Sequence, residues 1–287
     1  MELKKKGKNN MAITNFIPTV WSETLYTQLD KQYIAVANCN REFEGEIKGK
    51  GASVKICGVG DVLVKDYTKD TDMSTPQTLS DTVQELVIDQ AKYFNFQIDD
   101  IDRAQCTPKL MEAAMKVAAS GLANAADKHI YSLYENAGLT ITEDSPTEDR
   151  LLEKIIEART KLYENNVADS TEVILEVSPT VAQLLFKAKM NLASDNIGTF
   201  EKGIIGSIAG CKIYVSNNIE QIDDGGVIFH KCYMRTKRAI AFAEQLSEIN
   251  AYRPEKRFAD AVKGLYLFGA KVVYANELVV LDIGFTD

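Results

Sequence analysis

Histidine is scarce in this sequence, and its cysteines are few and scattered. The 287 residues include only His129 and His230, and neither lies in a G-x-S-x-G or comparable motif, although nucleophilic catalysis by serine or cysteine needs a histidine base in a defined setting. The five cysteines contain no C-x-x-C pair, whereas a zinc site needs four clustered ligands. We therefore expect no enzyme activity, no metal and no cofactor, and we expect reduced thiols in a cytoplasmic protein.

An excess of positive charge and a long apolar run are also missing. The 33 Lys and Arg face 41 Asp and Glu, which gives a net charge of -8, the opposite of what a protein that neutralises phosphates in bulk requires. This balance disfavours a sequence-specific DNA-binding protein. No run approaches the ~20 apolar residues of a membrane span, and polar residues, not an apolar segment, follow the lysine-rich residues 1–10. We expect a chain made in the cytoplasm without a membrane partner.

What is present is the composition of a globular protein, with 45% hydrophobic and 26% charged residues. Residues 46–70 combine recurrent glycine with apolar residues at alternate positions, as at Val54 and Ile56 and again at Val62 and Val64. Alternation of this kind is typical of strands. The segment therefore predicts a long twisted hairpin with little beneath it.

A long helix is the clearest local signal. Thr107 provides a cap, Pro108 occupies the first helical position and Gly138 is a natural terminator. The expected helix is about 44 Å long, more than most globular helices. Its apolar stripe includes His129, for which we expect a packing role because the only other histidine lies far away in the sequence.

The middle and the end of the chain change in character. Ser145 begins a capping-box pattern, Val173–Val177 is short and β-branched as a buried strand is, and Ser178-Pro179 starts another helix. From Gly203 the chain is rich in strand patterns. Together these segments predict an α+β fold.

One acidic pair and one thiol deserve a functional interpretation. Asp223-Asp224 could supply the general acid and base of a glycosidase, but followed by Gly225-Gly226 it also has the composition of a solvated turn, which we favour. Cys232 lies two residues from His230, and strand geometry would place both on one face. Without a third orienting group, we expect both side chains to pack.

Several segments in a fixed order carry a resemblance to a known family. They are Asn15-Phe16-Ile17-Pro18, Trp21-Ser22, Gly58-Val59-Gly60-Asp61-Val62, Phe96-Gln97-Ile98-Asp99-Asp100, Val177-Ser178-Pro179, residues 206–218, residues 258–266 and Gly269-Ala270-Lys271-Val272. From about residue 12 to its end the chain resembles the major capsid (coat) proteins of tailed bacteriophages with the Hong Kong 97-like fold, in the branch of the Salmonella podovirus coat protein. Each motif is weak alone, and their order and spacing carry the resemblance.

The resemblance implies an α+β architecture in which an arm and a hairpin loop reach over neighbouring subunits and a spine helix crosses a peripheral domain. The implied ranges are an N-terminal arm at 1–45, an extended hairpin loop at 46–90, a peripheral domain at 91–144 with a spine helix at 107–137, an axial domain at 145–235, and returning peripheral strands at 236–287. The analogy concerns fold more than chemistry.

The resemblance also implies a function and partners. Hexamers and pentamers of the chain would close into an icosahedral shell around phage double-stranded DNA, bound without sequence specificity, and the mature protein would lie in the virion after assembly in the host cytoplasm. No separate scaffolding segment is evident at the N-terminus, so we expect a separate scaffolding protein, together with a portal protein.

Residues of the implied loop are candidates for contacts between subunits. They are Lys48, Lys50, Lys55, Val59, Asp61 and Lys65. Cross-linking members of the family join a loop lysine to an asparagine, but no partner or catalytic carboxylate can be assigned in this sequence, so cross-linking is not expected from it.

Two alternatives stay open. An encapsulin-like nanocompartment has the same fold but encloses cargo enzymes. A soluble α+β hydrolase would use the region of Asp223 and Asp224.

Overall fold

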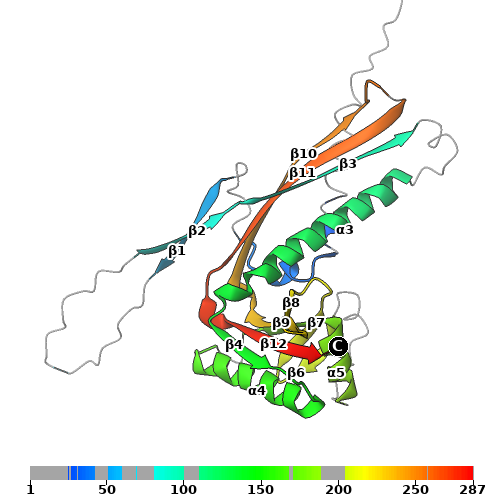
Figure 1. The fold of residues 1–287 in the computed structure, drawn as a ribbon. Helices are drawn as coiled ribbons and strands as arrows, with labels where there is room; N and C mark the ends of the chain where they lie inside the picture. The colour runs from blue at the N-terminus through cyan, green and yellow to red at the C-terminus, as the bar shows by residue number, and fades with distance from the viewer. Residues whose placement is uncertain are drawn as a thin grey trace, which may run out of the picture.

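The computed structural model describes residues 25, 27–30, 32–42, 51–59, 69, 81–99, 110–167, 171–188, 204–256 and 258–286. As predicted, they form an α+β fold, built from a long three-stranded sheet, a seven-stranded sheet and a two-stranded ribbon (Figure 1). No α-helix in these ranges combines the length and the hydropathy that a bilayer span requires.

The long sheet consists of three antiparallel strands in the order β10-β11-β3. Their bounds are β3 (Gln90–Asp99), β10 (Ile240–Tyr252) and β11 (Ala259–Val272). Side chains alternate between the two faces of a sheet. On β11, Val262, Tyr266 and Phe268 are buried, whereas Lys263 and Leu265 on the opposite face are exposed.

One long helix, α3 (Leu110–Tyr131), runs along the buried face of this sheet (Figure 1). The ring of His129 packs edge-on against Phe268 with centroids 5.6 Å apart, so the predicted packing role of this histidine is observed. A 3-10 turn, η3 (Ser132–Asn136), continues the helix almost to the predicted glycine terminator. The predicted cap at residues 107 and 108 lies outside the described residues.

The ribbon consists of β1 (Ser53–Val59) and β2 (Asp81–Val87), paired antiparallel along their whole length. In Figure 1 it leaves the long sheet sideways, and β2 leads almost directly into β3. The first strand of the hairpin predicted within residues 46–70 is observed as β1, whereas Val62 and Val64, predicted for its second strand, lie outside the described residues. The partner of β1 comes from farther along the chain, because β2 has its own alternation, with Leu86 buried between the exposed Glu85 and Val87.

The seven-stranded sheet has the order β4-β12-β9-β5-β7-β6, with β8 paired to β9. Its strands are β4 (Leu139–Glu143), β5 (Val173–Val177), β6 (Ile204–Ile208), β7 (Cys211–Val215), β8 (Gln221–Asp224), β9 (Val227–Thr236) and β12 (Leu278–Thr286). The predicted buried strand at 173–177 is observed with the same bounds, and all five of its residues are buried.

Two strands from the ranges that the resemblance implied for peripheral segments pair in the seven-stranded sheet. We expected β4 and β12 among the peripheral segments, at 91–144 and 236–287. The structure instead pairs β12 antiparallel with β9 and parallel with β4 in the seven-stranded sheet. The reason is the run Leu278–Ile283, whose residues are all buried, since a strand covered on both faces needs a position inside a sheet.

Two helices pack on the seven-stranded sheet, α4 (Glu148–Glu164) and α5 (Pro179–Lys187) (Figure 1). Ser178 caps α5 as predicted, because its hydroxyl accepts a hydrogen bond from the N–H of Val181. The cap of α4 is Thr147 and not the predicted Ser145. Thr147 is the residue with extended backbone that directly precedes the helix, and its hydroxyl accepts from the N–H of Arg150.

Two short 3-10 turns connect the sheets. They are η5 (Lys237–Ala239), between β9 and β10, and η6 (Ala275–Glu277), between β11 and β12. The backbone N–H groups of Val273 and Tyr274 both donate to the carbonyl of Ala239. The two connections thus lie side by side where the long sheet meets the seven-stranded sheet.

Candidate assembly interface and buried junction

One face of the ribbon is anchored on the outer face of the long sheet, opposite α3. Val54, Ile56, Leu86 and the following Ile88 are buried. They pack in one cluster with Ala241, Ala243 and Leu267 of the long sheet. The base of the ribbon is therefore part of the folded subunit.

The anchoring depends on a close backbone approach at Gly269 of β11. A Cβ atom at this position would lie 2.2 Å from the carbonyl oxygen of Val87 and 3.1 Å from the Cα of Ile88. Real Cβ atoms do not approach a backbone oxygen so closely, so only glycine lets the ribbon rest directly on the sheet.

The other face of the ribbon is open to solvent. Val83 is 52% exposed and Val87 is 47% exposed. Lys55 and Glu85, which are also exposed, lie opposite each other in the register. A two-stranded ribbon is marginal in water unless a further surface covers it, so this outer face is the candidate assembly interface.

The structure places two of the six loop candidates on the ribbon. Lys55 is exposed in the middle of β1, and Val59 ends β1 opposite Asp81. The other four candidates, at residues 48, 50, 61 and 65, lie outside the described residues.

A second region was not predicted from the sequence. Residues 33–42, here called the strap, include the 3-10 turn η1 (Val36–Asn38) and lie where the two sheets and α3 meet. The N–H groups of Ile34, Ala35 and Val36 all donate to the carboxylate of Asp127 on α3, each at 3.1 Å. Asp127 therefore acts for η1 as a capping side chain acts for a helix.

Arg235 of β9 holds the other end of the turn. Its guanidinium donates to the carbonyls of Ala35 at 3.0 Å and Asn38 at 2.6 Å. It also pairs with both carboxylate oxygens of Glu176 on β5, at 2.9 and 3.0 Å, and both side chains of this pair are 0% exposed. A buried bidentate pair of this kind is satisfied only in one geometry, so it fixes the position of the strap.

Burial sets the protonation of these groups. Burial raises the pKa of Asp127 to about 7, although its three backbone N–H donors lower it. Burial also raises the pKa of Glu176, and Arg235 partly offsets this effect. Burial alone would lower the pKa of Arg235, but the carboxylate of Glu176 outweighs it and raises the pKa.

The strap continues onto the edge of the long sheet. Asn40 donates its N–H to the carbonyl of Ile240 and accepts from the N–H of Phe242, both at 2.9 Å. Arg41 forms an ion pair with Glu244 at 2.7 Å. Glu244 also accepts hydrogen bonds from two buried tyrosine hydroxyls, those of Tyr33 and Tyr266.

The acidic pair at 223–224 forms a turn, as we favoured from the sequence. Asp223 and Asp224 end β8, and Gly225 and Gly226 have φ values of 67° and 91°, as a two-residue type I′ hairpin requires. Asp223 accepts a hydrogen bond from the N–H of Gly226 at 3.0 Å, and all four residues are exposed. The pair therefore shapes a hairpin and faces open solvent.

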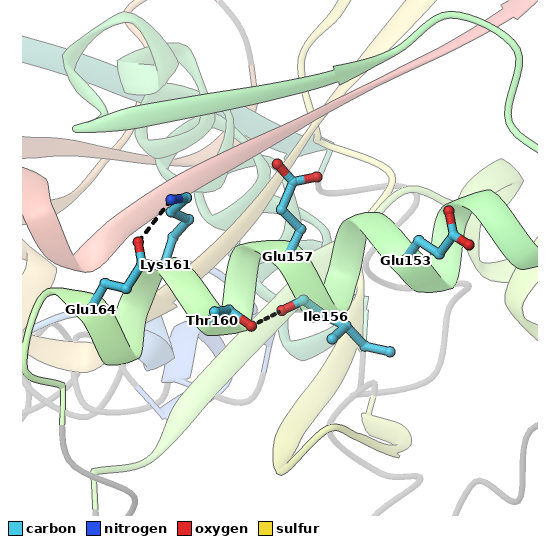
Figure 2. A pocket seen from close by; sticks show the side chains of 6 residues that line it. All are labelled: Glu153, Ile156, Glu157, Thr160, Lys161 and Glu164. Carbon is cyan, nitrogen blue, oxygen red and sulfur yellow. Dashed lines mark hydrogen bonds and ion pairs between the residues drawn. The ribbon is translucent and has the colours of Figure 1, made fainter.

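A shallow groove of about 480 Å³ lies elsewhere, along α4. Figure 2 shows its lining on one face of the helix: Glu153, Ile156, Glu157, Thr160, Lys161 and Glu164. Lys161 is paired with Glu164 at 2.7 Å, and Thr160 donates to the carbonyl of Ile156. A groove formed by one exposed helix face does not enclose a substrate as catalytic pockets do.

The histidine and cysteine candidates are packed. His230 is buried with its ring edge-on to Phe285 at 5.3 Å, and burial lowers its pKa. Burial raises the pKa of Cys232 to about 12, so its thiol is not a nucleophile at neutral pH. Within the described ranges, no three His, Cys, Asp or Glu side chains are grouped to hold a metal ion.

Most of the chain matches solved structures of known proteins. No protein-family model and no curated protein matches it. A chain of Mycobacterium phage Che8 is 29% identical, and the match covers 87% of this chain and 91% of that one, with a TM-score of 0.67. A chain from the capsid of Ralstonia phage GP4 is 12% identical over 99% and 96% of the two chains, with a TM-score of 0.68. A chain of a virus-like particle from Pyrococcus furiosus is 12% identical over 92% and 99%, with a TM-score of 0.54.

The fold therefore defines a class, that of α+β chains that share the fold of phage capsid structures. Within this class, the chain has the Hong Kong 97-like fold of tailed-phage capsid proteins, which was the fold expected from the sequence.

Proposed function

We propose that copies of this chain assemble into the icosahedral capsid of a tailed bacteriophage, with double-stranded DNA inside. The observation that carries the proposal is the ribbon: its inner face completes the subunit, whereas its outer face holds Val83 and Val87 half-exposed. In a subunit with a capsid fold, such a surface is suited to contact a neighbouring copy.

Many weak contacts are enough to close such a shell. A millimolar contact contributes only about 4 kcal/mol, but a subunit that makes several contacts at once gains from their combination. The net charge of -8 fits a container wall that does not grip its polyanionic content.

The domain assignment is also a proposal. The long sheet with α3 corresponds to the peripheral domain and its spine helix, and the ribbon corresponds to the base of the extended loop at 46–90. The seven-stranded sheet corresponds to the axial domain, to which we now add β4 and β12 because both pair within that sheet. The strap lies in the range of the proposed N-terminal arm, 1–45.

Finer assignments rest on the resemblance of the quoted segments. They place the chain in the branch of the Salmonella podovirus coat protein, with hexamers and pentamers in the shell. A separate scaffolding protein and a portal protein are the proposed partners, and assembly takes place in the host cytoplasm.

A second candidate is a nanocompartment shell. It is favoured by one observation, the match to the virus-like particle from Pyrococcus furiosus over 99% of that chain. The content of purified particles separates the two candidates: DNA and a portal support the virion, and a protein cargo supports the compartment.

The test is electron microscopy of the purified full chain, alone and with a co-expressed scaffolding protein. We expect closed shells, and we expect the chain with Val83→Ser and Val87→Ser to stay folded but to form none at a concentration just above the threshold of the unmodified chain. Circular dichroism checks that the double variant is folded. A full chain that stays monomeric at high concentration in both preparations, or normal shells from the double variant at that concentration, would contradict the proposal.

A further inference from the structure

The strap contacts every large element that meets at the junction. It is held by Asp127 of α3, by Arg235 of β9 with its partner Glu176 of β5, and by the edge of β10 at Asn40. Because β5 and β9 belong to one sheet and β10 to the other, the seated strap joins the two sheets and α3 into one body.

The charges at this junction do not balance. Asp127, Glu176 and Arg235, here called the junction cluster, are each at most 1% exposed. The cluster contains two carboxylates and one guanidinium, so in its fully ionised form it holds one excess negative charge away from water. Burying an uncompensated charge is strongly unfavourable, and uptake of a proton is the usual relief.

Asp127 is the group that takes up the proton. Glu176 has the guanidinium as a direct partner, whereas the partners of the Asp127 carboxylate among the described residues are three backbone N–H groups of the strap. The ionisable groups that act on this site are Glu176 of β5, Arg235 of β9, Tyr131 of α3 and Cys39 of the strap.

We propose that the strap is a proton-linked latch: it stays seated on both sheets while the junction cluster holds one extra proton, and it loosens when that proton is lost. Release of the strap removes hydrogen bonds to both sheets, because the seated strap bonds to Arg235 of β9 and to the edge of β10. Local opening of a short irregular segment needs less free energy than unfolding of the sheets.

The sign of the pH dependence follows from the raised pKa. In the seated state the pKa of Asp127 is about 7, against an ordinary value of 3.8. A released strap exposes the carboxylate, which then has its ordinary pKa and loses the proton. The seated state is therefore favoured at low pH, and this advantage is lost as the pH rises to about 7.

Hydrogen exchange of the unassembled full chain tests the latch. The probes are the amides of Ile34, Ala35 and Val36, compared with the amides of β9, after correction for intrinsic exchange rates. From pH 6 to pH 8 we expect the opening constant of the strap to rise about tenfold. At pH 8 we expect the strap to exchange at least ten times faster than β9.

Two variants test whether Asp127 is the group that binds the extra proton. Asp127→Asn keeps the oxygen that accepts from Ala35 and Val36 but cannot ionise, so the tenfold rise should be absent. Asp282→Asn is the control, because Asp282 is another buried carboxylate, 8% exposed against 1% for Asp127, and pairs instead with Lys231 at 2.6 Å. This variant should keep the rise.

Either of two results would overturn the latch. One is a strap that exchanges no faster than β9 at pH 8, and this result is available from the unmodified chain even where Asp127→Asn does not fold. The other is an Asp127→Asn chain with an unchanged pH profile.

Discussion

The ribbon and the strap are both narrow segments laid against the long sheet, and they differ in what covers them. The ribbon packs one face on Ala241 and Ala243 and leaves Val83 and Val87 in solvent. The strap is enclosed, and buried charges hold its backbone on both sides. Its polar groups find their partners within the subunit.

This difference in coverage assigns the strap to subunit folding and the ribbon's open face to assembly. A segment whose hydrogen bonds and apolar surface are satisfied internally stabilises the subunit, whereas a segment with an open apolar face gains stability from another surface. Substitutions in the junction should therefore change the free energy of unfolding, and substitutions on the outer face of the ribbon should change assembly.

The largest effect on stability is expected at the junction. Arg235→Met leaves Glu176 buried without its cation and removes the donors to the carbonyls of Ala35 and Asn38. Breaking a buried pair from one side lowers the free energy of unfolding by about 3–5 kcal/mol. Urea unfolding of the unassembled chain measures this loss.

A surface pair on the same sheet gives the matched control. Lys212 pairs with Glu172, and their side chains are 51% and 36% exposed, so Lys212→Met should change stability by less than about 1 kcal/mol. Equal losses of unfolding free energy in Arg235→Met and Lys212→Met would mean that burial does not make the Arg235–Glu176 pair more important for stability than an exposed pair.

A smaller effect is expected where the ribbon meets the long sheet. Gly269→Ala places a methyl group against the carbonyl of Val87, and overpacking of this kind lowers stability by about 1–3 kcal/mol. The amide of Ile88, which donates to the carbonyl of Ala52 at the base of the ribbon, should lose protection in hydrogen exchange.

Gly121→Ala is the control for this variant. Gly121 lies in α3 with no atom near the position of an added Cβ, so alanine there should raise stability by up to about 1 kcal/mol through helix propensity. A Gly269→Ala chain that keeps its stability and its ribbon protection would show that the ribbon does not rest on that glycine.

The fold was largely predictable from local patterns. The strand at 173–177, the cap at Ser178 and the hairpin turn at 223–226 follow from burial, capping and turn chemistry within a few residues. The partner of β1 and the place of β12 were not predictable in this way, because strand pairing depends on contacts between segments that are far apart in the sequence.

The junction was missed for the same reason, although the sequence held a signal. Glu176 interrupts the apolar run Val173–Val177, and Arg235 follows Met234 in a buried strand. A charged residue inside a strand that is buried on both faces must have a partner. No neighbouring residue in the sequence identifies that partner, and no motif indicated that residues 33–42 would bond to it.

The smallest effect on subunit stability, and the sharpest test of the comparison, is expected on the outer face of the ribbon. Val83→Ser with Val87→Ser should change the free energy of unfolding by no more than about 0.5 kcal/mol for each site, because both side chains are already half-exposed. If a neighbouring subunit buries them, each loses about 1.5 kcal/mol or more of contact free energy, which raises the concentration needed for assembly about tenfold for each valine. Light scattering against protein concentration measures that threshold. An unchanged threshold in the double variant would mean that the open face of the ribbon is not where copies meet. Ile56→Ser on the buried inner face is the control, because it should cause a large loss of subunit stability that the outer-face variant does not.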